Sequence, residues 1–170
     1  MEEFKVSTSE DKTAVYRELL PQLRSLVEAE EDFISNAANV SAALKQALSH
    51  VSWVGFYFLR KGELVLGPFQ GKVACTRIRM GAGVCGTAFA QRRTLVVPNV
   101  YEFPGHIFCD SDSKSEIVVP LLKDGQPFGV LDLDSSEYSS FDSVDSANLE
   151  IVAEIISDCY SQSIKGLNGG

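Results

Sequence analysis

The stretch SEIVVPLLKDGQPFGVLDLD, residues 115–134, decides the fold that this sequence predicts. Residues 115–122 and 127–134 are rich in β-branched and other apolar residues, which is typical of strands. Between them, residues 123–126 read Lys-Asp-Gly-Gln, and an Asp-Gly pair between apolar runs is typical of a tight hairpin turn. The stretch therefore predicts two antiparallel strands joined by a short turn.

Three carboxylates lie within this hairpin. Asp132 and Asp134 are two residues apart on the second strand, so their side chains share one face. Glu116 begins the first strand, and strand pairing brings it close to both at the open end of the hairpin. Such a trio is either a solvated strand face or the wall of a pocket. In a pocket it would bind a cationic amine, and it would keep one carboxyl protonated and able to donate a proton, because neighbouring like charges raise a carboxyl pKa.

Upstream of the hairpin, the spacing of apolar residues changes from helical to strand-like near residue 50. Residues 13–30 carry an apolar stripe at three- and four-residue spacing, and Pro21 inside it is expected to kink or break the helix. The aromatic run from Val51 to Leu59 predicts a strand. The other expected elements are a helix over residues 31–48, a hairpin return over 63–66, a loop over 67–71, a strand over 75–79, a short helix over 84–91, a strand over 94–97, an irregular segment over 99–114 and a last helix over 143–162.

These elements together predict an α+β fold. We expect one domain over residues 13–163, with flexible ends at residues 1–12 and 164–170. The sheet is expected to be mostly antiparallel, with the N- and C-terminal helices on one face. The irregular loops would cover the other face, where a ligand can bind.

The composition of the chain is that of a globular protein. Hydrophobic residues make up 45% and charged residues 22% of its 170 residues. A formal net charge of -8 disfavours nucleic acid and anionic membranes as partners. The first residues show no secretory signal, and no apolar run reaches the ~20 residues of a membrane span. We therefore expect an intracellular protein whose four cysteines are free, catalytic or metal-bound rather than a disulfide framework.

Three of the cysteines lie where redox chemistry can use them. Cys75, Cys85 and Cys109 fall on predicted strand ends and loops. A thiolate that reduces an oxidised substrate becomes a sulfenic acid, and a nearby thiol condenses with it to a disulfide. This pattern indicates redox chemistry, with unrelated buried thiols as the alternative. Cys159 lies on the apolar face of the last helix and is interpreted as a core residue.

Two other kinds of site fit this region less well. Cys75, Cys85, Cys109 and His106 are all possible zinc ligands, but structural zinc ligands usually come in close pairs, and Cys75 and Cys85 do not form one. Residues 81–86 spell G-x-G-x-x-G, the dinucleotide-binding pattern. The strand before them is polar and no further helix–strand unit follows, which favours a simple turn into a helix.

A series of short motifs runs along the chain. These are Trp53-Val-Gly-Phe-Tyr57, Leu66-Gly-Pro-Phe-Gln-Gly71, Gly83-Val-Cys85-Gly86-Thr87, Phe103-Pro-Gly-His106, Cys109-Asp110, Ser115-Glu-Ile-Val-Val-Pro120 and Gly129-Val-Leu-Asp-Leu-Asp134. In content, order and spacing they resemble the free methionine-(R)-sulfoxide reductases, which are single-domain GAF proteins. The resemblance extends over roughly residues 13–160.

The resemblance implies a GAF fold and a reaction, the reduction of free methionine-(R)-sulfoxide to methionine. It assigns the attack on the sulfoxide sulfur to Cys109, which becomes a sulfenic acid. It assigns the disulfide partner of Cys109 to Cys75. The third cysteine of the family falls on Cys85, and the resemblance implies that it is an alternative resolving thiol.

The resemblance also implies a set of substrate-binding residues. They are the aromatic pair Trp53 and Tyr57 around the methyl group, Glu116, Asp132 and Asp134 around the amine and the sulfoxide oxygen, and backbone amides around Ile107 and Phe108 for the carboxylate. Among these, Glu116 is also expected to protonate the departing oxygen.

The resemblance further implies what works with the protein. A thioredoxin-like dithiol would reopen the disulfide, and no cofactor or metal would be bound. A cytoplasmic homodimer is expected. The alternative is a non-catalytic GAF module that senses a small ligand such as a cyclic nucleotide.

Overall fold

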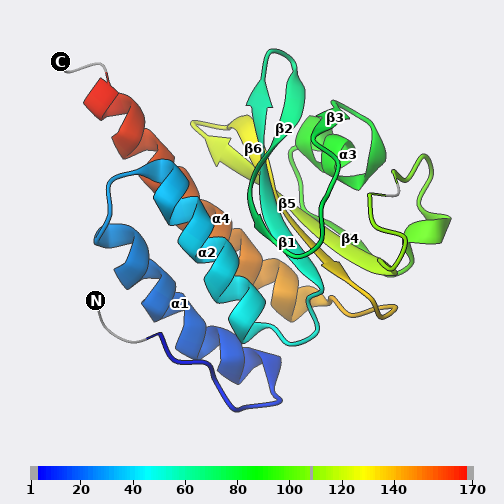
Figure 1. Ribbon diagram of the computed structural model, residues 1–170, viewed down its shortest axis with the longest axis horizontal. Coiled ribbons are helices and arrows are strands. Elements are labelled where there is room, and N and C mark those ends of the chain that lie inside the picture. Colours follow the sequence, from blue (N-terminus) through cyan, green and yellow to red (C-terminus); the bar gives the residue numbers. More distant parts are fainter. Residues whose placement is uncertain (1–3, 108, 168–170) are drawn as a thin grey trace.

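The computed structural model of the chain describes residues 4–107 and 109–167, with side chains described as far as residue 160. Its elements are α1 (Lys12–Glu28), α2 (Phe33–Ala47), β1 (Trp53–Arg60), β2 (Glu63–Gln70), β3 (Arg77–Arg79), α3 (Gly83–Gln91), β4 (Leu95–Val97), the short 3-10 helix η1 (Val100–Glu102), β5 (Ser115–Lys123), β6 (Gln126–Ser135) and α4 (Ser143–Leu167) (Figure 1). None of the helices in these described ranges is long and apolar enough to cross a membrane.

The strands form one six-stranded antiparallel sheet in the order β3-β2-β1-β6-β5-β4. The predicted hairpin of β5 and β6 lies within it. Its turn places Asp124 at φ 49° and Gly125 at φ 74°, the left-handed pair that suits the twist of a two-residue hairpin. The register that follows sets Glu116 opposite Asp134 and Val118 opposite Asp132. The pairing includes an irregularity between Leu121 and Leu122 that shifts the register by one residue, so the turn and this shift together determine which carboxylates meet.

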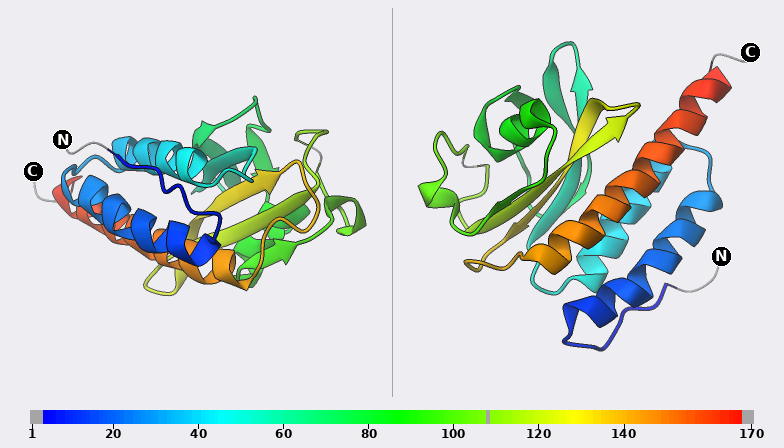
Figure 2. Two further views of the ribbon diagram at one scale, coloured as in Figure 1. Left: turned by 90° about the horizontal axis from the view of Figure 1, so that it is seen from below. Right: turned by 180° about the vertical axis from the view of Figure 1, so that it is seen from behind.

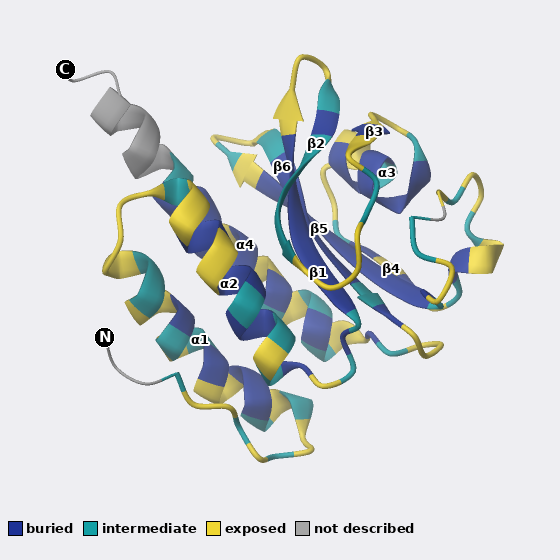
Figure 3. Ribbon diagram, viewed as in Figure 1, coloured by how far each residue is buried: buried dark blue, intermediate teal, exposed yellow. Residues whose placement is uncertain are grey.

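The sheet separates two layers (Figures 1 and 2). Helices α1, α2 and α4 cover one face, and α3 covers the other together with the irregular segments. Each face has its own hydrophobic core, the larger one beneath the three long helices. Burial follows this arrangement, since the central strands and the inward sides of the helices are buried (Figure 3). The predicted α+β fold, with terminal helices on one face and loops on the other, is confirmed.

A buried polar cluster ties α1 to the start of α4 within the helical layer. The Asp145 side chain is 0% exposed and accepts hydrogen bonds from Tyr16 Oη at 2.9 Å and from Lys12 Nζ. His50 Nε2 lies 3.5 Å from the same carboxylate. Burial alone would raise the pKa of Asp145, but the bonds from His50, Lys12, the backbone of Asp142 and Tyr16 together lower it to about 2. This carboxylate is therefore ionised and fully partnered.

Two local predictions were wrong. Pro21 does not break the first helix, because α1 runs without interruption from Lys12 to Glu28. Leu19 and Leu23 on either side of the proline are buried, so packing against the core outweighs the lost backbone hydrogen bond. The predicted loop at residues 67–71 is strand as far as Gln70, because β2 pairs with β1 along most of its length.

Contacts and secondary structure extend toward both ends of the described residues. Phe4 packs against the main core. The main chain of Lys5 exchanges two hydrogen bonds with the Gln22 amide, at 2.7 and 3.0 Å. Helix α4 continues to Leu167, past the point at which the sequence predicts a tail.

Candidate active site

A disulfide joins two segments on the loop face of the sheet. Cys75 lies between β2 and β3, Cys109 lies before β5, and their Cα atoms are 5.3 Å apart. The two cysteines are separated by 34 residues in the chain. This is the pair that the family resemblance assigns to attack and resolution. The fold thus brings together two thiols that the sequence alone could not pair.

The predicted aromatic pair is buried beside this disulfide. Trp53 and Tyr57 project from the same face of β1, with ring centroids 6.1 Å apart. Each ring also holds the segment that carries Cys75: Tyr57 Oη donates to the Cys75 carbonyl and Trp53 Nε1 to the Lys72 carbonyl, both at 3.0 Å. The aromatic residues therefore form a wall of the pocket and anchor the loop of one redox cysteine.

Glycines make room for this wall, a feature that the sequence reasoning missed. A Cβ atom added at Gly71 would lie 2.5 Å from Cδ1 of Trp53, and the φ of Gly71 is +133°. A Cβ atom added at Gly55 would lie 2.6 Å from Cη2 of the same ring and 2.4 Å from Cβ of Phe69. Both glycines belong to the family motifs quoted above, so those motifs are the sequence feature that could have indicated their role.

The three predicted carboxylates meet as the hairpin register requires. Glu116 is 5% exposed and Asp132 6%, while Asp134 is half-buried. Burial, and then the neighbouring charges of Asp132 and Asp134, raise the pKa of Glu116 well above its ordinary value. Burial raises the pKa of Asp132 to about 6, although hydrogen bonds with Cys85 and Glu116 act in the opposite direction. The trio therefore favours protonated carboxyl groups near neutral pH.

Cys85 belongs to the carboxylate cluster rather than to the disulfide. It is a buried free thiol on α3, with its Sγ 4.0 Å from Glu116 Oε1. Burial, followed by the charges of Asp132 and Glu116, raises its pKa well above the ordinary value. The thiol form is therefore favoured at neutral pH. Its predicted role as an alternative resolving thiol stays a prediction.

The turn before α3 is not a dinucleotide site. The preceding strand, β3, is a short edge strand that pairs antiparallel with β2, so the parallel β-α-β unit of that motif is missing among the described residues. Gly81 and Gly83 have φ values of +79° and +60° and turn the chain into the helix. The interpretation of residues 81–86 as a tight turn that leads into a helix is confirmed, since α3 begins at Gly83.

His106 takes a position that the sequence reasoning did not foresee. Its Nδ1 lies 3.7 Å from Glu116 Oε2, and burial lowers its pKa. The sequence reasoning considered His106 only as a zinc ligand together with Cys75, Cys85 and Cys109. That set does not assemble here, because the disulfide occupies two of its four members.

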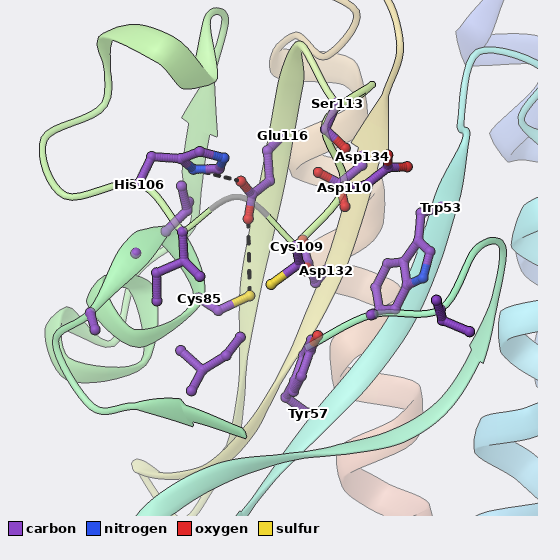
Figure 4. A pocket seen from close by; sticks show the side chains of 17 residues that line it. Trp53, Tyr57, Cys85, His106, Cys109, Asp110, Ser113, Glu116, Asp132 and Asp134 are labelled. Atoms are coloured by element: carbon purple, nitrogen blue, oxygen red, sulfur yellow. Dashed lines mark hydrogen bonds and ion pairs between the residues drawn. The ribbon is translucent and has the colours of Figure 1, made fainter. Parts of the chain in front are cut away.

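Trp53, Tyr57, Cys85, His106, Cys109 and the three carboxylates line one pocket (Figure 4). Ile107 lies on its wall, whereas Phe108 is outside the described residues. Asp110 and Ser113, which the sequence reasoning missed, also line it. No Lys or Arg side chain is among the described residues of the wall. The pocket therefore presents thiols, aromatic rings and carboxylates without a cation of its own.

A surface ion pair links the two loops of the disulfide. Lys72, near Cys75, pairs with Asp112 and lies 3.5 Å from Asp110 Oδ1, next to Cys109. Both partners of the Lys72–Asp112 pair are largely exposed. The sequence reasoning missed this pair because its members are 40 residues apart.

Cys159 remains outside the pocket. It is buried on α4 under the helical layer, and Asn36 Nδ2 donates to its Sγ at 3.0 Å. The prediction that it is a core residue is confirmed.

The fold is that of a GAF domain. The GAF domain family matches residues 29–159 of the chain. The relative "GAF domain-containing protein A" of Dictyostelium discoideum is 53% identical over 146 residues, which are 85% of this chain and 92% of that protein.

Other relatives carry a more specific name. The free methionine-R-sulfoxide reductase of Escherichia coli is 44% identical over 146 residues, which cover 85% of this chain and 88% of that enzyme. The solved structure of the free methionine-R-sulfoxide reductase of Neisseria meningitidis, in complex with its substrate, superimposes with a TM-score of 0.94 and 48% identity, covering 98% of this chain and 99% of that one. The chain belongs to the family of free methionine-R-sulfoxide reductases.

Proposed function

We propose that the protein reduces free methionine-(R)-sulfoxide to methionine. The observation that carries this proposal is the carboxylate cluster of Glu116, Asp132 and Asp134, which shares its pocket with Cys109 of the Cys75–Cys109 disulfide and has no Lys or Arg side chain among the described residues of the wall. A free amino acid brings the missing positive charge on its ammonium group. The names of the relatives at 44% and 48% identity point to the same substrate.

Substrate selection follows from charge and shape. The ammonium of the amino acid pairs with the carboxylates, and the methyl group packs against Trp53 and Tyr57. Backbone amides around Ile107 and Phe108 bind the substrate carboxylate. A methionine sulfoxide inside a peptide has no free ammonium, so it would leave buried carboxylates unpaired, which is a costly mismatch.

The reduction begins at Cys109. Its sulfur attacks the sulfoxide sulfur while Glu116, kept protonated by its environment, gives a proton to the sulfoxide oxygen. Methionine leaves, and the oxygen remains on Cys109 as a sulfenic acid. The substrate sulfur gains two electrons, and the Cys109 sulfur loses two.

The enzyme is then restored in two steps. The Cys75 thiol condenses with the sulfenic acid, which releases water and forms the Cys75–Cys109 disulfide; Cys85 is the alternative resolving thiol. A thioredoxin-like dithiol reopens the disulfide by exchange and becomes oxidised itself. This requirement for reducing equivalents supports a cytoplasmic location. A homodimer is part of the proposal, on the family resemblance alone.

The test is a turnover assay with a dithiol reductant and three substrates: free methionine-R-sulfoxide, its free S epimer and a peptide-bound R sulfoxide. We expect only the free R epimer to be consumed. Cys109→Ser should abolish methionine formation, whereas the matched control Cys159→Ser, which removes a core thiol outside the pocket, should retain it. No turnover of any substrate by the reduced wild type would overturn the proposal and favour a ligand-sensing GAF module.

A further inference from the structure

Three side chains in the pocket have potential metal-binding atoms that lie close to one another. The sulfur of Cys85, a carboxylate oxygen of Glu116 and a carboxylate oxygen of Asp132 all lie within 4.8 Å of one another. All three residues are buried, and they come from three different elements, α3, β5 and β6. Figure 4 shows them converging on one side of the pocket. The primary path of the proposed cycle uses Glu116 and Asp132 but not the Cys85 thiol.

One atom of this cluster lacks a partner. Asp132 is 6% exposed, and its Oδ1 is buried without a hydrogen-bond partner among the described residues. A buried polar atom left without a hydrogen-bond partner destabilises the folded protein, and more so when it is charged. Asp132 also lines the pocket, so its orphan oxygen is available to a ligand there. This observation, which is independent of the cluster geometry, points to a missing electropositive partner.

The surroundings favour a cation over a neutral donor. The described wall of the pocket holds Glu116, Asp132, Asp134 and Asp110 but no Lys or Arg. His106, the remaining basic group of the wall, has its pKa lowered by burial and adds no positive charge at neutral pH. During turnover the substrate ammonium supplies the charge. Between turnovers the site is open to another cation.

We propose that Cys85, Glu116 and Asp132 bind a divalent cation of the zinc class, and that this cation excludes the substrate ammonium. The first part rests on the cluster alone, and the second rests on the proposed function. A thiolate and two carboxylates suit zinc, which takes three protein ligands and one water in open tetrahedral sites. Magnesium and calcium need six or more oxygen ligands and are disfavoured by the thiol.

Binding involves proton release and no redox change. Tetrahedral zinc holds its ligands roughly 3.5 Å apart, so atoms that lie up to 4.8 Å apart need to close by up to about 1.3 Å around the metal. The Cys85 proton and any carboxyl proton pass to solvent as the sulfur–metal and oxygen–metal bonds form. Affinity should therefore rise with pH.

The test titrates Zn²⁺ into the full-length protein after reduction and removal of metal, in competition with a chromophoric zinc chelator. We expect one site per chain, and Cys85→Ser and Asp132→Asn should each weaken it at least tenfold. The matched control Cys159→Ser should bind as the wild type does. Co²⁺ in place of Zn²⁺ should give a thiolate-to-cobalt charge-transfer band that Cys85→Ser removes and Cys109→Ser keeps. Both conservative variants are checked for native folding by circular dichroism.

Competition with methionine tests the second part. Methionine carries the ammonium and cannot be reduced, so it should raise the apparent Kd for Zn²⁺ in proportion to its concentration. The inference is overturned if the wild type binds no Zn²⁺, or if Cys85→Ser binds it like the wild type. Turnover of free sulfoxide in the presence of a chelator is measured separately. Turnover without zinc binding refutes only this inference. Zinc binding without turnover refutes the proposed function and, with it, the second part of the inference, and leaves the zinc site itself standing.

Discussion

Two aspartates of this molecule are buried to nearly the same extent, one on each side of the sheet, and they behave in opposite ways. Asp145, in the helical layer, is 0% exposed and has a pKa of about 2. Asp132, in the pocket, is 6% exposed and has a pKa of about 6. The difference is in their partners. Lys12, Tyr16 and His50 surround the first, whereas other acids and a thiol surround the second.

This contrast separates a structural acid from a functional one. A buried carboxylate with a cation and hydrogen bonds contributes to the stability of the folded protein. A buried carboxylate among other acids costs stability and is relieved only by a ligand that carries positive charge. The Asp145 carboxylate is therefore paired within the protein, whereas on the proposed function the Asp132 carboxylate is paired only when a ligand is bound.

The largest effect should come from removing the acid that protonates the oxygen. Glu116→Gln keeps the shape of the side chain but cannot ionise or donate a carboxyl proton. We expect kcat to fall by about 10²–10⁴-fold, the usual contribution of general acid catalysis. In the comparison variant Asp145→Asn, the folded fraction should keep its kcat within about twofold. The measurement is the rate of methionine formation. An equal loss of kcat in Glu116→Gln and Asp145→Asn would contradict the distinction between the pocket acids and the buried acid of the helical layer.

For the free energy of unfolding, the variant in the helical layer should have a larger effect than the variant in the pocket, which is the reverse of the order expected for kcat. Asp145→Asn leaves Lys12 without its buried charged acceptor, and we expect a loss of about 2–4 kcal/mol. Asp132→Asn removes an unfavourable charge, so at pH 8 it should leave the stability unchanged or increase it. Denaturant unfolding of the reduced proteins measures both values. A destabilisation by Asp132→Asn as large as that of Asp145→Asn would contradict the account.

The dependence of stability on pH should have two opposed parts. The folded pKa of Asp132, about 6, lies above its ordinary value of 3.8, so its stabilising effect is complete below about pH 4 and is lost as the pH rises to 6. The folded pKa of Asp145, about 2, lies below that value, so its effect is complete above about pH 4 and is lost as the pH falls to 2. Between pH 6 and 4 acidification should therefore make the wild type gain more stability than Asp132→Asn does. The measurement is the free energy of unfolding of both proteins at several pH values between 6 and 4. An equal change of this free energy with pH in the two proteins would refute the prediction.

The smallest effect is expected at the ion pair between the two disulfide loops. Lys72→Met removes an exposed pair, and such pairs contribute at most about 1 kcal/mol. We expect disulfide formation after one turnover to slow by up to about fivefold, with the first release of methionine unchanged. Rapid-quench thiol counting separates the two steps. Lys61→Met, in the exposed turn between β1 and β2, is the control, and an equal slowing in both variants would exclude a role for the pair.

The hairpin could be predicted because local rules determine it, and side-chain alternation puts Asp132 and Asp134 on one face. The position of Glu116 depends in addition on the irregularity between Leu121 and Leu122, which shifts the register by one residue and which the local pattern does not predict. The same alternation placed Trp53 and Tyr57 together. The resemblance to a family supplied the pairing of Cys75 with Cys109, which no local rule contains.

Contacts between irregular segments could not be predicted. His106 meets Glu116, and Lys72 meets Asp110 and Asp112, from loops without periodicity. Their positions depend on tertiary packing of the whole loop face. Pro21 failed as a helix breaker for a related reason, since burial on both sides of it outweighs its local preference.

Proton release on ligand binding tests the central claim most directly, namely that the pocket acids await a positive charge. Methionine is titrated into the reduced protein near pH 6 by calorimetry, in buffers of different ionisation enthalpy. The account predicts net proton release, because the ammonium lowers the pKa of Asp132 and its neighbours, and it predicts a smaller release for Asp132→Asn. Binding of methionine without proton release, or with proton uptake, would contradict the claim.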